Sequence, residues 1–225
     1  CEKHPFAYTK LPTSTPKDLD ISITDFVKIR DVDTSKSKRL TFAKDIFLLS
    51  FYTGGINLAD IVKIDFSGNE ISYTRQKSKD HKRKDKTTRI NIVQEAREII
   101  SKYINTKGIL DFGYKFSYIN LCRYINSCLK RLAKELNIKS NISFYSARKT
   151  FAQFAAEIAI PYPIIEYCLG HSIKTSITIN SYIRIKPQQA NAAIRRVIEY
   201  TQNPGMFEDF INLRNQMPVS YTHLR

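Results

Sequence analysis

The sequence predicts a mainly α-helical domain with a small three-stranded antiparallel sheet, that is, an α+β fold. Apolar residues recur at helical spacing over most of the chain after residue 22. Apolar and polar residues alternate between residues 63 and 93, where Ser67-Gly68-Asn69 is typical of a turn between strands. With 225 residues, of which 42% are hydrophobic, the chain is long enough to bury the core of one domain.

The first helices are expected in the N-terminal quarter of the chain. Residues 1–22 contain three prolines and several serines and threonines without sustained periodicity, so we expect an interdomain linker there. A short helix is expected over residues 23–31. Residues 40–53 are apolar almost all round and are followed by two glycines, which is typical of a buried helix with a glycine stop. One or two further helical turns are expected over residues 57–64.

Alternating apolar residues mark the predicted sheet, and helical spacing returns after it. Ile71 and Tyr73 alternate with polar residues, as do Ile90 and Ile92. Helices are then expected over residues 94–104, 118–136, 145–159, 162–168, 175–184 and 188–200. In residues 118–136 the apolar side chains fall on one stripe, and the lysines and arginines face outward.

The chain is strongly basic. It contains 36 Lys and Arg against 21 Asp and Glu, which gives a net charge of +15 and a pI near 9.6. This balance favours a polyanionic partner, because each neutralised phosphate releases counterions. An anionic membrane surface is the alternative, but there is no long basic amphipathic helix and no apolar run near the roughly 20 residues of a membrane span. We therefore expect a nucleic-acid partner and no membrane.

The four cysteines show no metal-binding or redox pattern. They form no Cys-x-x-Cys pair and no Cys/His cluster with zinc spacing. We expect them to be small buried side chains of a cytoplasmic protein, and we expect neither a metal nor another cofactor.

Tyr145 and Arg148 are the first candidates for chemistry. At i and i+3 they are expected to share a helix face, with Ser143 as the N-cap. A phosphate at this helix start would meet free backbone N–H groups, and Arg148 would bind it through two parallel hydrogen bonds. The alternative is an ordinary surface arginine beside a packing tyrosine.

His171, Tyr182 and a basic loop are further candidates. His171 follows a Leu-Gly pair that ends a predicted helix, and it is either a structural hydrogen-bonding residue or a donor to a phosphate oxygen. Tyr182 lies in a predicted helix but is one of 13 tyrosines, so its position alone identifies little. The loop 77–86 either follows a DNA backbone, with one lysine acting as an acid at a phosphate, or is a solvated turn.

Five motifs in order resemble the catalytic domain of the tyrosine recombinase (phage integrase) family. They are Thr53-Gly54 with Asn57-Leu-Ala-Asp60, Arg75-Gln-Lys77, Tyr145-Ser-Ala-Arg148-Lys149-Thr150-Phe151-Ala152, Leu169-Gly170-His171 and Tyr182. They are similar to the family's Thr-Gly-x-Arg-x-x-Glu box, strand lysine, His-x-x-Arg-His-Thr-Phe-Ala box, Leu-Gly-His box and nucleophilic tyrosine. The likeness spans roughly residues 24–200 and is closest to integrases of conjugative and mobilisable transposons.

The chain departs from the family pattern at several positions. Asn57 stands where the first arginine is expected, and Tyr145 and Lys149 replace two histidines. Tyr182 lies about two residues further from His171 than is common. A missing phosphate-gripping arginine would cost about 2–4 kcal/mol in an apolar site, so either another cation replaces it or the enzyme is slow or cannot cut. The candidates to replace it are Lys149, Arg75 and Lys63.

The resemblance implies a fold, a reaction and roles for individual residues. The fold is that of DNA breaking and rejoining catalytic domains, and the reaction cuts and rejoins strands through a 3′-phosphotyrosine. Tyr182 would be the nucleophile, and Arg148 and His171 would stabilise charge on the phosphate. Lys77 would protonate the leaving oxygen, and Tyr145 would orient the phosphate or His171. Further DNA contacts would come from Arg75, Lys79, Lys82, Arg83, Lys84, Lys86 and Lys149.

The resemblance also implies an organisation and partners. Residues 23–200 would be the catalytic domain, preceded by a core-binding domain and followed by a tail over residues 201–225. Either the helix over 188–200 or a weak apolar cluster at 206–213 passes to a neighbouring protomer, or both pack on their own domain. The partner would be double-stranded DNA at attachment sites, on which four protomers assemble, whereas the isolated chain would be a monomer. A type IB topoisomerase-like relaxation of supercoils and a non-catalytic DNA-binding module are the alternatives.

Overall fold

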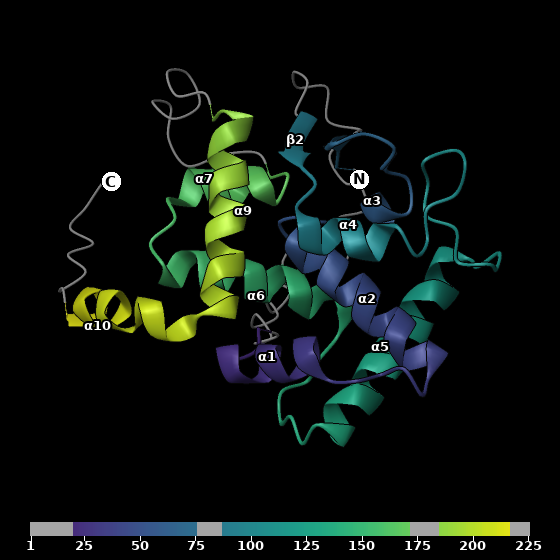
Figure 1. Cartoon of the computed structure of the whole chain (residues 1–225), viewed down its shortest axis with the longest axis horizontal. Coiled ribbons are helices and arrows are strands. Elements are labelled where there is room, and N and C mark those ends of the chain that lie inside the picture. The colour runs from purple at the N-terminus through teal and green to yellow at the C-terminus, as the bar shows by residue number, and fades with distance from the viewer. Residues whose placement is uncertain (1–19, 76–86, 172–184, 217–225) are drawn as a thin grey trace, which may run out of the picture.

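The computed structural model describes residues 20–75, 87–171 and 185–216. Over these ranges the chain is mainly helical, as predicted, with one pair of antiparallel strands (Figure 1). The helices are α1 (Ile23–Asp31), α2 (Lys38–Tyr52), α3 (Leu58–Ile61), α4 (Gln94–Ile100), α5 (Tyr118–Glu135), α6 (Phe144–Glu157), α7 (Tyr162–Cys168), α9 (Pro187–Gln202), the short 3-10 helix η2 (Pro204–Phe207) and α10 (Glu208–Gln216). The strands are β1 (Glu70–Thr74) and β2 (Thr87–Asn91). The helix predicted over residues 175–184 lies outside the described residues.

Helix α2 is the centre of the core. Residues 45–52 are all buried, as the apolar sequence predicts, because α4, α5 and α6 pack around this helix. The Phe51 ring centroid lies 4.2 Å from that of Phe26 in α1 and 5.9 Å from that of Phe151 in α6. Two glycines with φ of +80° follow the helix and turn the chain back toward α6. The core thus joins the N-terminal helices to the helix that holds Arg148.

The sheet contains two strands within the described residues, so the prediction of three strands is wrong. β1 and β2 pair antiparallel, with Ile71 opposite Ile90. In place of the first predicted strand, the Asp65 carboxylate accepts a hydrogen bond from the Ser67 amide at 2.9 Å. The Phe66 amide donates at 2.7 Å to a carbonyl in the loop after α4. The Asp65 side chain thus forms a local turn, and a single backbone hydrogen bond connects this segment to a neighbour. This arrangement buries the apolar residues without the regular hydrogen bonds of a strand, so alternation of apolar residues alone predicted one strand too many.

Helix α9 covers α6, α7 and β2 from one side (Figure 1). Its apolar side chains Ile194, Val197 and Ile198 are buried, so the helix expected over residues 188–200 has one apolar face on the domain. The helix therefore packs on its own domain, one of the two arrangements expected for it.

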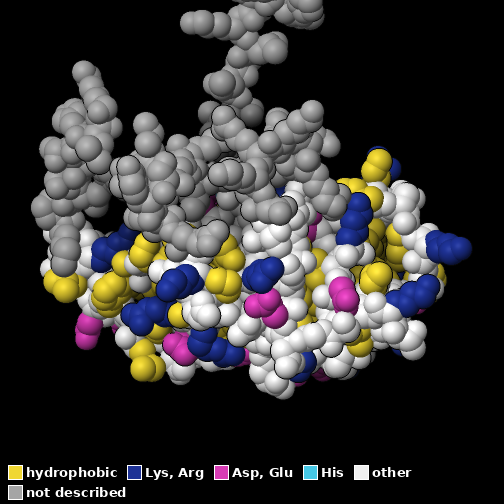
Figure 2. Space-filling model, turned by 90° about the horizontal axis from the view of Figure 1, so that it is seen from above, with side chains coloured by type: hydrophobic (Ala, Val, Ile, Leu, Met, Phe, Trp, Pro, Cys, Tyr) yellow, Lys and Arg dark blue, Asp and Glu magenta, His cyan; other side chains and the backbone are white. Residues whose placement is uncertain are grey.

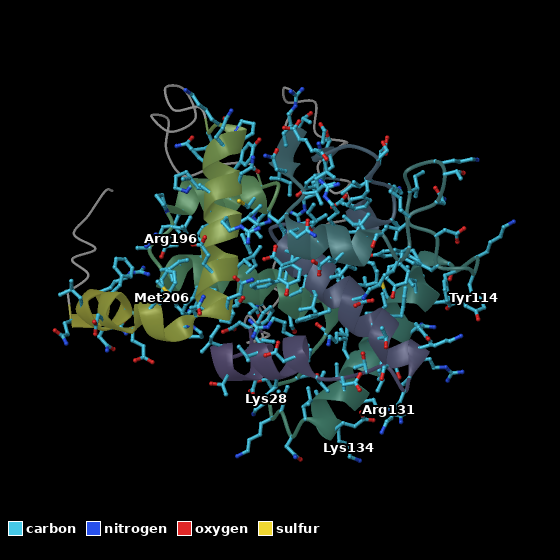
Figure 3. The ribbon with its side chains drawn as sticks, viewed as in Figure 1. Lys28, Tyr114, Arg131, Lys134, Arg196 and Met206 are labelled. Atoms are coloured by element: carbon cyan, nitrogen blue, oxygen red, sulfur yellow. The ribbon has the colours of Figure 1, made fainter. Side chains whose placement is uncertain are left out.

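The described part of the expected tail is helical and also contacts the domain. Phe207 of η2 is buried, and Arg196 of α9 lies 5.4 Å from its ring centroid. Arg214 of α10 donates to the Glu157 carbonyl at the end of α6 at 2.9 Å. Figure 3 shows Arg196 and Met206 at this end of the molecule, where 81% of the Met206 surface is exposed. The tail thus covers the end of α6 and still leaves apolar side chains in solvent.

Figure 2 shows the molecule from above, with its described side chains coloured by type. In Figure 2 the visible lysines and arginines are spread among acidic and neutral side chains. No helix in the described ranges is both long and apolar enough to cross a membrane.

Candidate active site

The N-terminus of α6 positions Tyr145 and Arg148. The Ser143 amide donates to Ser146 Oγ at 3.0 Å, so Ser143 lies at the N-cap, as predicted. From this start, Arg148 points into the protein and only 3% of its surface is exposed. Tyr145, one turn earlier, is 44% exposed. The interpretation of Arg148 as an ordinary surface arginine is therefore wrong.

Arg148 is held by backbone carbonyls from two distant segments. Its Nη1 donates to Gly55 O at 2.7 Å, and its Nη2 donates to Leu169 O at 2.6 Å. Nη2 also lies 2.8 Å from His171 Nε2. A buried guanidinium costs free energy unless it is hydrogen-bonded, and these acceptors provide that compensation without neutralising its charge. The side chain is thus fixed in place while its positive charge stays available to an anion.

His171 is fixed between Arg148 and Glu166. Its Nδ1 lies 3.0 Å from Glu166 Oε2. Because a guanidinium can only donate, His171 Nε2 accepts from Arg148 and the Nδ1–H group donates to Glu166. In this state the imidazole is neutral. The geometry therefore assigns a tautomer to His171 and identifies Glu166 as the residue that orients its ring.

The electrostatics of the site suit an anion. Burial lowers the pKa of Arg148, and the charge of nearby Arg75 lowers it further, whereas Tyr73, Tyr145 and Asp60 oppose this shift. Burial also lowers the pKa of His171, and the Arg148 charge adds to this effect, whereas the hydrogen bond to Glu166 opposes it. Groups that lower one another's pKa in this way repel when charged. A phosphate placed among them would remove this repulsion.

Two glycines let the backbone approach the site closely. Gly55 has φ of +80°, and a Cβ there would lie 3.2 Å from Arg148 Cα and 3.1 Å from Leu169 Cδ2. Gly170 has φ of +62°, and a Cβ there would lie 3.1 Å from Tyr73 Oη. Both positions require a backbone conformation that favours glycine, and a Cβ at either one would crowd its neighbours.

The structure brings together some of the predicted site residues. Arg148 and His171 are in contact, and Tyr145 lies one helical turn from Arg148. Asn57 is the half-buried N-cap of α3, and its side chain makes no capping hydrogen bond. Arg75, at the end of β1, and Lys149 of α6 are half-buried. The residues outside the described ranges are Lys77, Lys79, Lys82, Arg83, Lys84, Lys86 and Tyr182.

Three parts of the site were not predicted. They are the Glu166 carboxylate and the carbonyls of Gly55 and Leu169. The only sequence signal for Glu166 is its position one helical turn before the Leu-Gly-His motif, and backbone carbonyls leave no signal in a sequence.

No model of a protein family matches this chain, and no similar curated protein is found. Among solved structures, the crystal structure of XerA recombinase is similar to it. The two chains are 16% identical, the match covers 86% of this chain and 67% of that chain, and the TM-score is 0.47.

Glu166→Gln is expected to lower the pKa of His171 still further. The carboxylate favours the charged imidazole, so replacing it with a neutral amide removes that support while keeping a hydrogen-bond acceptor. The measurement is a titration of the His171 ring signals by NMR, assigned with His171→Asn. Glu135→Gln, which removes an exposed carboxylate of α5, is the control and should leave the titration unchanged. A rise in the His171 pKa on Glu166→Gln would contradict the assigned hydrogen bond.

Proposed function

We propose that this chain is the catalytic part of a site-specific DNA recombinase that cuts and rejoins strands through a 3′-phosphotyrosine. The observation that supports this best is the contact between Arg148 and His171, 23 residues apart in the sequence, with the arginine buried and held by carbonyls. A fixed guanidinium beside a histidine that can gain a proton matches what a phosphoryl-transfer site needs. The order of the sequence motifs and the net charge of +15 also support DNA as the substrate.

In the proposed reaction, Tyr182 loses its hydroxyl proton to solvent as its oxygen attacks the scissile phosphorus, and the bond from phosphorus to the 5′-oxygen breaks. Lys77 gives a proton to that oxygen, which leaves as a free 5′-hydroxyl. Arg148 binds the non-bridging oxygens, and His171 joins it as a donor once its ring is protonated. Tyr145, one helical turn before Arg148 in α6, orients the phosphate. The covalent link keeps the phosphodiester energy, so a second strand's 5′-hydroxyl can reverse the step without ATP.

Covalent trapping tests the proposed function. The full chain is incubated with a library of nicked DNA duplexes of random sequence, and protein–DNA adducts are separated on denaturing gels. A phosphotyrosyl adduct is expected, and Tyr182→Phe should abolish it. Tyr162→Phe, which alters an exposed tyrosine at the start of α7, is the matched control and should retain the adduct.

The outcomes of this experiment separate the alternatives. An adduct that survives Tyr182→Phe would overturn the assignment of the nucleophile. DNA binding without any adduct would instead indicate a non-catalytic module. Relaxation of supercoiled plasmid without sequence preference would indicate a topoisomerase activity.

We further propose that the reaction occurs in an assembly of four protomers on paired attachment sites, for integration or excision of a mobile element. Helix α10 is the better candidate for contact with a neighbouring protomer, because α9 packs on its own domain. Phe210 and Leu213 of α10 are exposed together with Met206, whereas the apolar side of α9 is buried. Without DNA, the chain is expected to be a monomer.

A further inference from the structure

The end of β1 holds an arginine without an evident structural role. Arg75 follows Thr74, the last residue of the strand, and its Nε atom is buried. No residue that the structure describes accepts a hydrogen bond from this atom. Buried donors without a partner are rare in folded proteins, so each one needs an explanation. A ligand that supplies the missing acceptor is one such explanation.

The neighbours of β1 place Arg75 beside the candidate active site. Arg75 follows the strand directly, two residues after Tyr73. The Tyr73 hydroxyl donates to Cys168 O at 3.4 Å and lies against Gly170. This same segment provides the Leu169 carbonyl that holds Arg148. Arg75 therefore leaves the strand beside the residue that contacts the segment that builds the site.

Charge interactions agree with this placement. Among charged groups near Arg148, Arg75 has the largest effect on its pKa, and Arg75 also lowers the pKa of His171. Two guanidinium groups close enough to repel are unfavourable in the free protein, and an anion that contacts both reverses the sign of this interaction.

We propose that Arg75 supplies the second guanidinium that binds the scissile phosphate, in place of the arginine that Asn57 lacks. Its buried Nε–H and one terminal N–H form a fork that suits two oxygens of a phosphodiester. Arg75 and Arg148 then bind the anion from two sides, one from β1 and the other from α6. The DNA phosphodiester as ligand rests on the proposed function, whereas anion binding by the two arginines does not.

Inorganic phosphate is the probe that tests this pair directly. The NMR signals of the His171 ring are followed as phosphate is added at constant ionic strength. Arg75→Gln is expected to weaken phosphate binding about tenfold or more, because a charge-assisted hydrogen bond to a buried donor is lost. Arg89→Gln, which removes an exposed arginine from the neighbouring strand, should change it by less than about twofold. Equal affinities of wild type and Arg75→Gln would overturn the proposal.

Two further readouts separate the possible failures. Without phosphate, Arg75→Gln should melt at a temperature no lower than that of wild type, because a repulsive charge is removed. A clearly lower melting temperature would instead assign Arg75 a structural role and overturn the proposal. In the adduct assay, an Arg75→Gln protein as active as Arg89→Gln would overturn the role of Arg75 while the proposed function stands. If phosphate binding depends on Arg75 but the protein never forms an adduct, the anion site stands and the proposed recombinase function is overturned.

Discussion

Replacing Arg148 with lysine is expected to slow formation of the phosphotyrosyl adduct by about 10²–10³-fold, the range seen when one donor to a developing charge is removed. A lysine ammonium has no planar fork, so it cannot bond both carbonyls and still face the phosphate. The carbonyls of Gly55 and Leu169 would also lose their donor inside the protein. The rate is measured by single-turnover trapping on the nicked duplex at saturating DNA.

The control for this prediction is an arginine-to-lysine change on the surface. Arg131, exposed on α5 (Figure 3), makes a surface ion pair with Glu135, so Arg131→Lys should leave the rate within about twofold of wild type. Both variants are checked for folding by thermal unfolding, because unsatisfied buried carbonyls in Arg148→Lys are expected to cost about 1–3 kcal/mol of stability. An unchanged adduct rate in folded Arg148→Lys would remove Arg148 from the reaction.

Gly55→Ala is expected to reduce the free energy of unfolding by about 2–4 kcal/mol, from two causes that add. At φ of +80° a Cβ strains the backbone, and it would also lie within 3.2 Å of Arg148 and Leu169. Any shift that relieves this crowding moves the carbonyl that holds the guanidinium. Adduct formation should therefore slow as well. Chemical denaturation followed by circular dichroism measures the stability.

Gly113→Ala is the matched control for the crowding around Gly55. Gly113 has a similar φ of +72°, but a Cβ there would meet nothing within 4 Å. Its alanine variant is expected to lose only the backbone cost, about 1–2 kcal/mol, and to keep full activity. Equal losses in the two variants would show that close packing at Gly55 has no energetic effect.

The helices could be predicted from the sequence because helical spacing is local. Apolar periodicity predicted the positions of α2 and α9, and a serine predicted the N-cap of α6. The first of the three predicted strands was wrong because burial of Ile64 produces the same alternation whether or not its backbone pairs. Strand pairing depends on a partner distant in the chain, and alternation does not reveal that partner.

The same distinction between local signals and distant contacts applies to the candidate site. The sequence by itself determined the order of Arg148, His171 and Tyr182, the positive charge and the uncharged Asn57, because residue type and spacing are properties of the chain alone. Only the tertiary structure decided that Arg148 is buried, that Glu166 orients His171, and that the charge of Arg75 acts on both Arg148 and His171. Burial and hydrogen-bond partners depend on which distant segments meet. Here the turn after α2, the end of β1 and the segment after α7 meet around one side chain of α6.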